Sequence, residues 1–199
     1  MSKRAFDIAA SGAGLLVLSP VIATVAAVVR ARLGKPVIFA QLRPGRNGKV
    51  FRLRKFRTMK PIDPANGLVN DEDRLTPLGQ ALRAASLDEL PTLWNVLRGD
   101  MSMVGPRPLL VEYLDRYTAT QARRHEVRPG VTGLAQVNGR NDISWDERLR
   151  LDVRYVDGRS WKMDIVILAR TLAMVLRRAG IAARGHATMP EFMPEATDG

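Results

Sequence analysis

Two adjacent carboxylates, Asp88 and Glu89, are the residues best suited to chemistry in this sequence. Ser86 and Glu89 have the S-x-x-E spacing of a capping box, and Pro91 is typical of a helix start. An apolar run over 93–97 follows, so the pair is predicted to lie in the first turn of a helix. Such a pair either caps the helix only or supplies a nucleophile, because a carboxylate can attack phosphorus. The positive end of the helix is expected to keep Asp88 ionised.

A second chemical feature is Arg107, which lies between Pro106 and Pro108. The two prolines hold the backbone extended, so the guanidinium is presented at low entropic cost and suits bidentate binding of phosphate. The alternative is a rigid surface turn without a ligand. Lys55 and Arg57, in a basic segment nearer the N-terminus, are further candidates for phosphate contact.

Composition narrows the kinds of site that this chain can build. It has no cysteine, and its two histidines, His125 and His186, lie far apart in the sequence. A disulfide scaffold, a thiolate metal site and a thiol nucleophile are therefore excluded, and a histidine zinc site is not expected. A metal would have to be a hard cation held by carboxylates and phosphate.

The positive charge of the chain is concentrated at its N-terminal end. The formal net charge is +11, yet residues 1–60 hold 13 Lys or Arg and one acid, Asp7, so this third alone carries +12. A basic block beside an apolar segment favours binding to anionic lipid head groups over binding to nucleic acid. We expect no nucleic-acid partner.

Residues 8–29 carry no charge over 22 positions, which is long enough for a membrane helix. A cleaved signal peptide is disfavoured because basic residues follow at once from Arg30. A spanning helix would leave one basic flank outside the cell, against the positive-inside rule. We favour a re-entrant helix, because Ser19-Pro20 breaks the run at its middle and both basic flanks then stay cytoplasmic. The Ser19 hydroxyl can satisfy a carbonyl that the break frees.

The rest of the chain alternates between short periodic segments and turn signals. Residues 35–59 predict a two-stranded hairpin with one basic face, and 61–73 predict a lid-like loop. A helix is predicted from Pro77 to Ala85. Further predictions are an extended run over 101–104, a helix over 109–126, a strand over 134–137, a helix opened by a capping box from Ser144 to about Asp157, and an amphipathic helix over 161–178.

Five segments of the sequence resemble the bacterial sugar transferases, the monotopic phosphoglycosyl transferases that start glycan assembly on a polyprenyl phosphate. These segments are KFRTM (Lys55–Met59), RLTPLG (Arg74–Gly79), SLDELPTLWNVLRGDMSMVGPRPL (Ser86–Leu109), RPGVTGLAQVNGRN (Arg128–Asn141) and LDVRYV (Leu151–Val156). The resemblance covers nearly the whole chain and corresponds to the minimal catalytic form of the family.

The resemblance implies a reaction and a set of site residues. A sugar-1-phosphate would pass from a nucleoside diphosphate sugar, usually UDP-linked, to undecaprenyl phosphate with release of UMP. The implied intermediate is covalent and lies on Asp88, and the implied cofactor is Mg²⁺, with Glu89 and Asp88 as its ligands. Positions near the phosphates and the nucleotide are matched by Arg83, Arg107, Arg140 and Asp164.

We therefore expect an α+β, mostly helical fold in three parts. These are a re-entrant membrane helix with basic flanks over 1–33, a cytoplasmic catalytic domain over 34–180 and a C-terminal tail over 181–199. Amphipathic helices are expected to lie on the cytoplasmic face of the inner membrane, in contact with phospholipid. A homodimer is compatible with the sequence. The alternative is a non-catalytic membrane-peripheral protein that binds anionic lipid or nucleic acid through its basic N-terminal third.

Overall fold

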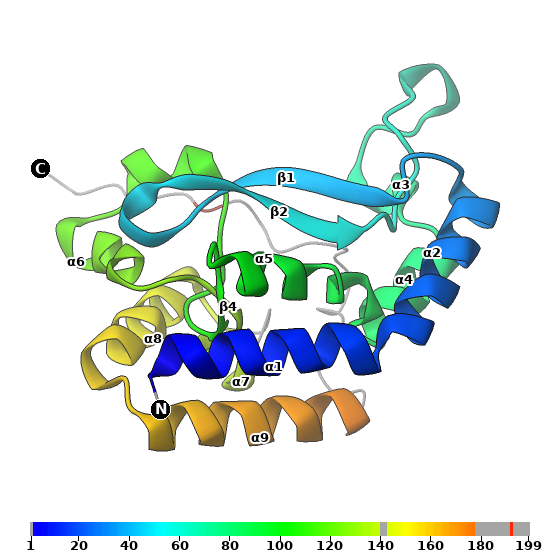
Figure 1. Cartoon of the computed structure of the whole chain (residues 1–199). Coiled ribbons are helices and arrows are strands. Elements are labelled where there is room, and N and C mark those ends of the chain that lie inside the picture. The colour runs from blue at the N-terminus through cyan, green and yellow to red at the C-terminus, as the bar shows by residue number, and fades with distance from the viewer. Residues whose placement is uncertain (1, 140–142, 178–191, 193–199) are drawn as a thin grey trace, which may run out of the picture.

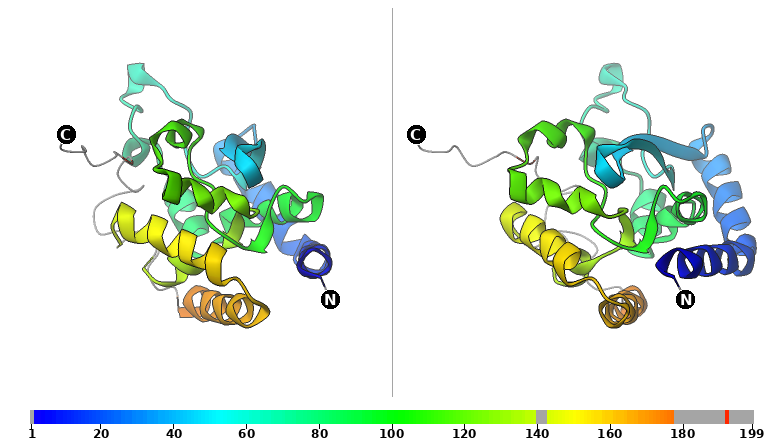
Figure 2. Two further views of the ribbon diagram at one scale, coloured as in Figure 1. Left: turned by 90° about the vertical axis from the view of Figure 1, so that its left-hand side faces the viewer. Right: turned by 60° about the vertical axis from the view of Figure 1, so that its left-hand side comes forward.

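The computed structural model of the chain describes residues 2–139, 143–177 and 192. This part is mostly helical and contains two small two-stranded sheets, which confirms the predicted mostly helical α+β fold. Helices α1 and α9 run along one side of the domain, and the hairpin of β1 and β2 lies across the opposite side (Figure 1; Figure 2). The segments that carry Asp88 and Arg107 lie between these two layers.

The N-terminal apolar run forms two helices, α1 (Lys3–Val17) and α2 (Ser19–Leu33), which are bent by 62°. Pro20 lies in the first turn of α2, and the Ser19 hydroxyl donates to the Leu16 carbonyl at 2.7 Å. The predicted break and its hydroxyl partner are thus confirmed. Among the described residues no single helix has the length and apolarity to cross a membrane, whereas the bent pair meets both criteria when taken together.

The first half of α1 is part of the folded domain. Arg4 donates to two carbonyls at the C-terminal end of α5 (Thr92–Arg98), at 2.6 and 2.7 Å. Asp7 is buried and accepts from the Ser102 hydroxyl at 3.0 Å and the Met103 backbone N–H at 2.9 Å. A buried carboxylate needs such donors, because an unpaired one would be costly to desolvate. The first two turns of α1 are therefore held by polar contacts to α5 and to the segment at Ser102 and Met103.

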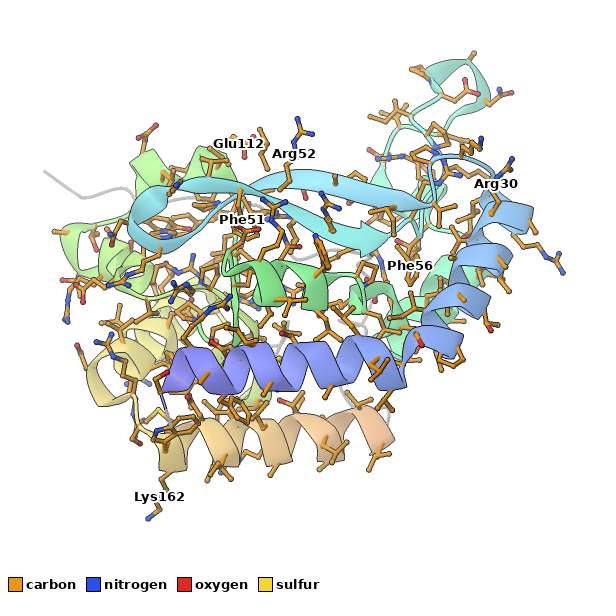
Figure 3. The ribbon with its side chains drawn as sticks, viewed as in Figure 1. Arg30, Phe51, Arg52, Phe56, Glu112 and Lys162 are labelled. Carbon is orange, nitrogen blue, oxygen red and sulfur yellow. The ribbon has the colours of Figure 1, made fainter. Side chains whose placement is uncertain are left out.

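The predicted hairpin is confirmed as β1 (Ile38–Pro44) and β2 (Val50–Phe56), which are antiparallel. Leu53 packs on α5 in the core, whereas Arg52 projects from the opposite face of the hairpin (Figure 3). Because side chains alternate along a strand, Lys55 shares the inner face with Leu53. The hairpin thus directs Lys55 toward the inside of the domain and leaves other basic side chains, such as Arg52, in solvent.

Apolar packing around α2 positions the segment that contains Asp88. Val25 and Val29 of α2 form a buried cluster with Phe56 of β2 and with Leu82 of α4 (Pro77–Ala84). The two leucines that flank the acidic pair, at 87 and 90, pack against this cluster. The acidic pair is therefore anchored on both sides by burial of apolar surface.

Two predicted helix starts, one from Pro77 and one from the capping box at Ser144, are confirmed. Thr76 accepts from the Gly79 N–H at 3.0 Å at the start of α4. Ser144 accepts from the Glu147 N–H at 3.2 Å at the start of α8 (Trp145–Gly158). The amphipathic helix is also confirmed, as α9 (Trp161–Arg177). Its final predicted residue, Arg178, lies outside the described residues.

Three predictions between these elements were wrong. Residues 109–126 form no single helix, because Thr118 begins a new one with its own capping box. Residues 134–137 are helical; the strand, β4 (Gly130–Thr132), precedes them and pairs in parallel with β3 (Ser102–Val104). The loop over 61–73 contains two helical turns. The elements concerned are η2 (Pro64–Asn66), α3 (Asp71–Arg74), β3 (Ser102–Val104), η4 (Val111–Arg116), α6 (Ala119–Ala122), η5 (Arg123–Glu126), β4 (Gly130–Thr132) and α7 (Leu134–Val137).

The predicted tail over 181–199 lies outside the described residues except for Phe192. This side chain is buried and contacts the rings of Tyr113, Tyr117 and Trp145. One position of the predicted tail therefore belongs to the core.

Candidate active site

Glu89 is held by two cations that come from separate elements. Its Oε1 atom accepts from Lys55 Nζ at 2.6 Å and from Arg107 Nη2 at 3.0 Å. Burial alone would raise the pKa of Glu89, but the two cations outweigh it, so the pKa lies well below its usual range. The pKa shift therefore favours the ionised form of Glu89 at neutral pH.

Asp88 lies in η3 (Leu87–Glu89), a short 3-10 turn, and is buried with 7% of its surface exposed. Ser86 lies in the left-handed region at φ 54°, and its side chain caps no helix. The predicted capping box is therefore wrong, because α5 begins only at Thr92. A left-handed serine is disfavoured by roughly 1–2 kcal/mol, so the surrounding packing must impose this turn.

The surroundings of Asp88 raise the pKa of its carboxyl, whereas a helix N-terminus would lower it. Burial raises the pKa of Asp88, and the charge of Glu89 raises it further. Lys55, Arg83 and Arg107 act in the opposite direction, but the net pKa is raised above that of an ordinary aspartate. The predicted position of Asp88 in the first turn of a helix is thus wrong, because Asp88 lies in the separate turn η3 and α5 begins only at Thr92.

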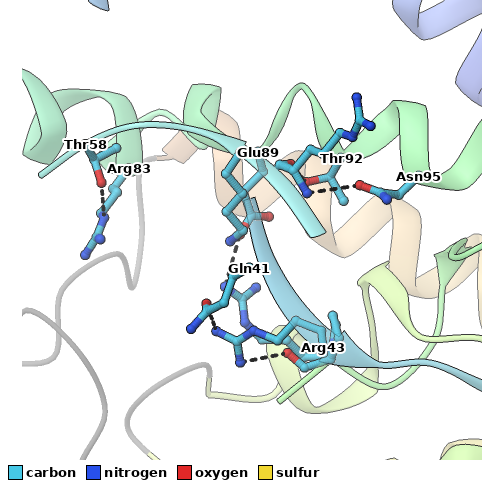
Figure 4. A network of polar contacts seen from close by, with 11 residues as sticks. Gln41, Arg43, Thr58, Arg83, Glu89, Thr92 and Asn95 are labelled. Carbon is cyan, nitrogen blue, oxygen red and sulfur yellow. Dashed lines mark hydrogen bonds and ion pairs between the residues drawn. The ribbon is translucent and has the colours of Figure 1, made fainter. Parts of the chain in front are cut away.

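Four of the predicted site residues come together with Asp88. Besides Glu89, Lys55 and Arg107, the charge of Arg83 acts on this carboxyl. The Nε of Arg83 donates to the Thr58 hydroxyl at 3.2 Å, and Figure 4 shows this pair to one side of Glu89. The site is thus two adjacent carboxylates facing three cations.

Two other predicted residues, Arg57 and Asp164, are placed away from the acidic pair. Arg57 is buried, and its guanidinium donates to the carbonyls of Leu33 and Lys35, so it anchors the end of α2. Asp164 accepts from Lys3 at 2.5 Å and from the Tyr155 hydroxyl at 2.8 Å, which ties α9 to α1 and α8. Neither contacts the acidic pair. Arg140 lies outside the described residues.

A buried ion pair behind Arg107 was missed by sequence reasoning. Arg124 donates to the backbone carbonyl of Arg107 at 2.7 Å and pairs with Asp152 at 2.6 Å. Both side chains of the pair are 1% exposed. They are 28 residues apart in the sequence, and no local pattern relates them. The ion pair fixes the backbone from which Arg107 reaches Glu89.

A cavity of about 70 Å³ opens beside Glu89. Its polar lining includes Lys55 and Arg107, together with Arg43 from β1, which sequence reasoning did not select. Its floor is apolar and includes Leu53. Three cations and one carboxylate around one cavity make it positively charged, so it suits an anionic ligand.

The donor set determines what metal the acidic pair could hold. Within the described ranges, no three or more His, Cys, Asp or Glu side chains gather into a metal site. Asp88 and Glu89 alone offer carboxylate oxygens, and both cations engage the same Glu89 oxygen, Oε1. Mg²⁺ is commonly bound by one or two carboxylates and completed by substrate phosphates and water. The pair therefore fits Mg²⁺ bound together with a phosphate substrate.

The sequence profile of the family described as bacterial sugar transferase matches residues 1–178, which include this whole cluster. The chain belongs to the bacterial sugar transferase family. Relatives support the assignment across the full length. The uncharacterized sugar transferase EpsL of Bacillus subtilis (strain 168) is 52% identical over 191 residues, covering 96% of this chain and 95% of the relative.

Two further bacterial sugar transferases have more specific names. The exopolysaccharide production protein ExoY of Rhizobium meliloti (strain 1021) is 37% identical over 198 residues, covering 90% of this chain and 88% of the relative. The undecaprenyl-phosphate galactose phosphotransferase of Salmonella typhimurium is 40% identical over 196 residues, covering 89% of this chain. The matched region is only 41% of that longer relative. This bacterial sugar transferase is accordingly an enzyme of the phosphoglycosyl transferase type.

Proposed function

We propose that this enzyme transfers a sugar-1-phosphate from a UDP-sugar to undecaprenyl phosphate and releases UMP, through a phosphosugar bound covalently to Asp88. The proposal rests on one observation above all. A buried aspartate is adjacent to an ionised glutamate that two cations hold, and this glutamate lines a positively charged cavity. The names of relatives supply the lipid acceptor and suggest galactose or glucose as the sugar.

The proposed reaction has two displacements at one phosphorus atom. In the first, a carboxylate oxygen of Asp88 bonds to the β-phosphorus, the bond from that phosphorus to the bridging oxygen breaks, and UMP leaves with the electron pair. In the second, a phosphate oxygen of the lipid attacks the same phosphorus and Asp88 leaves as a carboxylate. Arg83 and Arg107 are placed to offset repulsion between the diphosphate and the acidic pair.

Mg²⁺ is the cofactor that we propose for this site, held by Glu89 and Asp88 together with the substrate phosphates. When bound it would neutralise phosphate charge and orient the diphosphate. Lys55 and Arg107 keep Glu89 ionised, so its carboxylate is available as a ligand at any physiological pH.

UMP release provides the test of this function. The full-length enzyme in detergent is incubated with undecaprenyl phosphate and with UDP-galactose, UDP-glucose or other UDP-sugars in turn. We expect UMP release with one donor that requires both the lipid and Mg²⁺, and that stops when EDTA is added and resumes with excess Mg²⁺. No UMP from any donor, or full activity in EDTA, would contradict the proposal.

We also propose that the bend between α1 and α2 enters the membrane from the cytoplasmic side and returns. Leu16 and Val17, just before the bend, are 76% and 73% exposed. Beside α1, helix α9 leaves Leu172 and Leu176 exposed (Figure 1). Apolar side chains of this size are normally buried, so their exposure at the bend and along α9 favours contact with lipid. The charged residues on the outer face of the hairpin, such as Arg52, would then meet anionic head groups or water.

Single-cysteine labelling tests this topology, because the natural chain has no cysteine. Cysteines replace Ser2, Lys35 and, as a marker of the catalytic side, the exposed Asn66. A membrane-impermeant maleimide is expected to label none of the three in intact cells and all three after permeabilisation. Labelling of only one of Ser2→Cys and Lys35→Cys in intact cells would instead establish a spanning helix.

A further inference from the structure

Arg43 is the cation in the cavity that has no acidic partner within the described ranges. Lys55 and Arg107 both pair with Glu89, whereas Arg43 makes no ion pair among the described residues. Glu112 acts on it electrostatically without reaching salt-bridge distance. Among the described residues, no salt bridge therefore neutralises the charge of Arg43.

The guanidinium of Arg43 is held in place but not saturated. Its Nη2 donates to Gln41 Oε1 at 2.6 Å, and its Nη1 makes a long contact of 3.4 Å to the Pro108 carbonyl. Its Nε is buried and has no hydrogen-bond partner. Figure 4 shows Gln41 and Arg43 extending beyond Glu89. A buried donor without a partner is destabilising, which favours a ligand that would accept from it.

The electrostatic surroundings of Arg43 also favour a bound anion. Burial, and after it the charge of the neighbouring Arg107, together lower the pKa of Arg43 to about 10. Both effects reflect a cation that is removed from water and lies close to another cation. An anion between the two guanidinium groups would relieve this repulsion, and guanidinium geometry matches phosphate oxygens.

The position of Arg43 on the hairpin indicates which phosphate it binds. The register pairs Arg43 with Phe51 near the turn, whereas Phe56 at the other end of β2 packs on α2. A lipid acceptor guided by α2 would approach from the Phe56 end. The donor nucleotide comes from the aqueous phase and can occupy the end near the turn.

We propose that Arg43, oriented by Gln41, binds the diphosphate of the donor on the side of the cavity opposite Glu89. This inference rests on the proposed function for the identity of the donor, but the anion site itself does not depend on catalysis. Arg43 would hold the phosphate that leaves with the nucleotide, so its loss should weaken donor binding.

Binding measured by calorimetry on the full chain in detergent tests the proposal with UDP, inorganic pyrophosphate and uridine as probes. Arg43→Gln is expected to weaken binding of UDP and of pyrophosphate by about 10- to 100-fold, because one charged hydrogen-bond group is lost. Binding of uridine should not change. Arg43→Lys keeps the charge but loses the planar fork, so an intermediate loss is expected. Thermal unfolding of each variant checks that it is folded.

Arg46→Gln is the matched control, because Arg46 is an exposed arginine in the turn (Arg46–Gly48) that follows β1, three residues from Arg43. Equal losses in the two glutamine variants, or UDP affinity within twofold of wild type in Arg43→Gln, would overturn the proposal. A rise in KM for undecaprenyl phosphate with unchanged UDP affinity would assign Arg43 to the acceptor and overturn it too. If wild type released no UMP while Arg43→Gln still lost pyrophosphate affinity, the anion site would stand and the proposed function would fail.

Discussion

Asp88→Asn is expected to lower the rate of UMP release by about 10,000-fold or more, because an amide cannot replace a carboxylate nucleophile. Wild-type enzyme incubated with donor but no lipid should gain the mass of one phosphosugar, and Asp88→Asn should gain none. Intact-protein mass spectrometry measures both. Asp146→Asn is the control, since Asp146 is exposed at the start of α8. A phosphosugar adduct that persists in Asp88→Asn would place the nucleophile elsewhere.

The raised pKa of Asp88 gives this variant a second signature. A carboxyl whose pKa is higher in the folded state favours the protonated form there, so its ionisation at neutral pH opposes folding. Asp88→Asn should therefore have a higher Tm than wild type at pH 7, and the difference should shrink as the pH falls and Asp88 becomes protonated. In wild type, kcat/KM for the donor should fall on acidification at a pH above the pKa of an ordinary aspartate. A Tm unchanged at pH 7 would contradict this account of the site.

Glu89→Gln is expected to lower kcat by about 100- to 1,000-fold, the usual cost of removing one charge-stabilising group from a site. Unlike Asp88→Asn, it should leave the nucleophile able to form an adduct slowly. The adduct should therefore appear in mass spectra after long incubation. Wild-type kcat in Glu89→Gln would exclude Glu89 from both metal binding and catalysis.

The stability of Glu89→Gln should change in the direction opposite to that of Asp88→Asn. Glu89 has a pKa that is lowered on folding, so its ionised form contributes stability above the pKa of an unfolded glutamate. Replacing it leaves Lys55 and Arg107 without their shared carboxylate, so the Tm at pH 7 should fall. Opposite shifts in two adjacent variants would be hard to obtain from packing alone, because Asn and Gln nearly preserve the shapes of the natural side chains.

Residue motifs predicted the chemistry better than they predicted the local structure around it. Asp88, Glu89, Lys55, Arg83 and Arg107 were selected from the sequence, and the fold brings them together. The capping box that first drew attention to the pair does not form. Its spacing was correct, but the left-handed backbone at Ser86 gives a separate turn before α5. Packing of the flanking leucines on α2 outweighs a capping preference of about 1 kcal/mol.

Structural features that depend only on contacts between residues close in the sequence could be predicted from the sequence alone. The caps at Thr76 and Ser144 and the break at Ser19-Pro20 each depend on a hydrogen bond to a backbone group no more than three residues away. Such contacts form whenever the local chain is helical, whatever the rest of the protein does.

Only the tertiary structure determines which acceptor each basic side chain contacts. Lys55 and Arg107 reach Glu89 across 34 and 18 residues, while Arg57, two positions from Lys55, turns instead to the end of α2. The alternation of side chains along a strand would place Lys55 and Arg57 on the same face of the hairpin. The strand ends at Phe56, however, so this alternation no longer determines the direction of the Arg57 side chain. Lys55 and Arg107 thus pair with a carboxylate, whereas the buried guanidinium of Arg57 donates to backbone carbonyls. The partner of each cation depends on which acceptors the fold brings beside it, because a buried charged group is costly unless it is hydrogen-bonded.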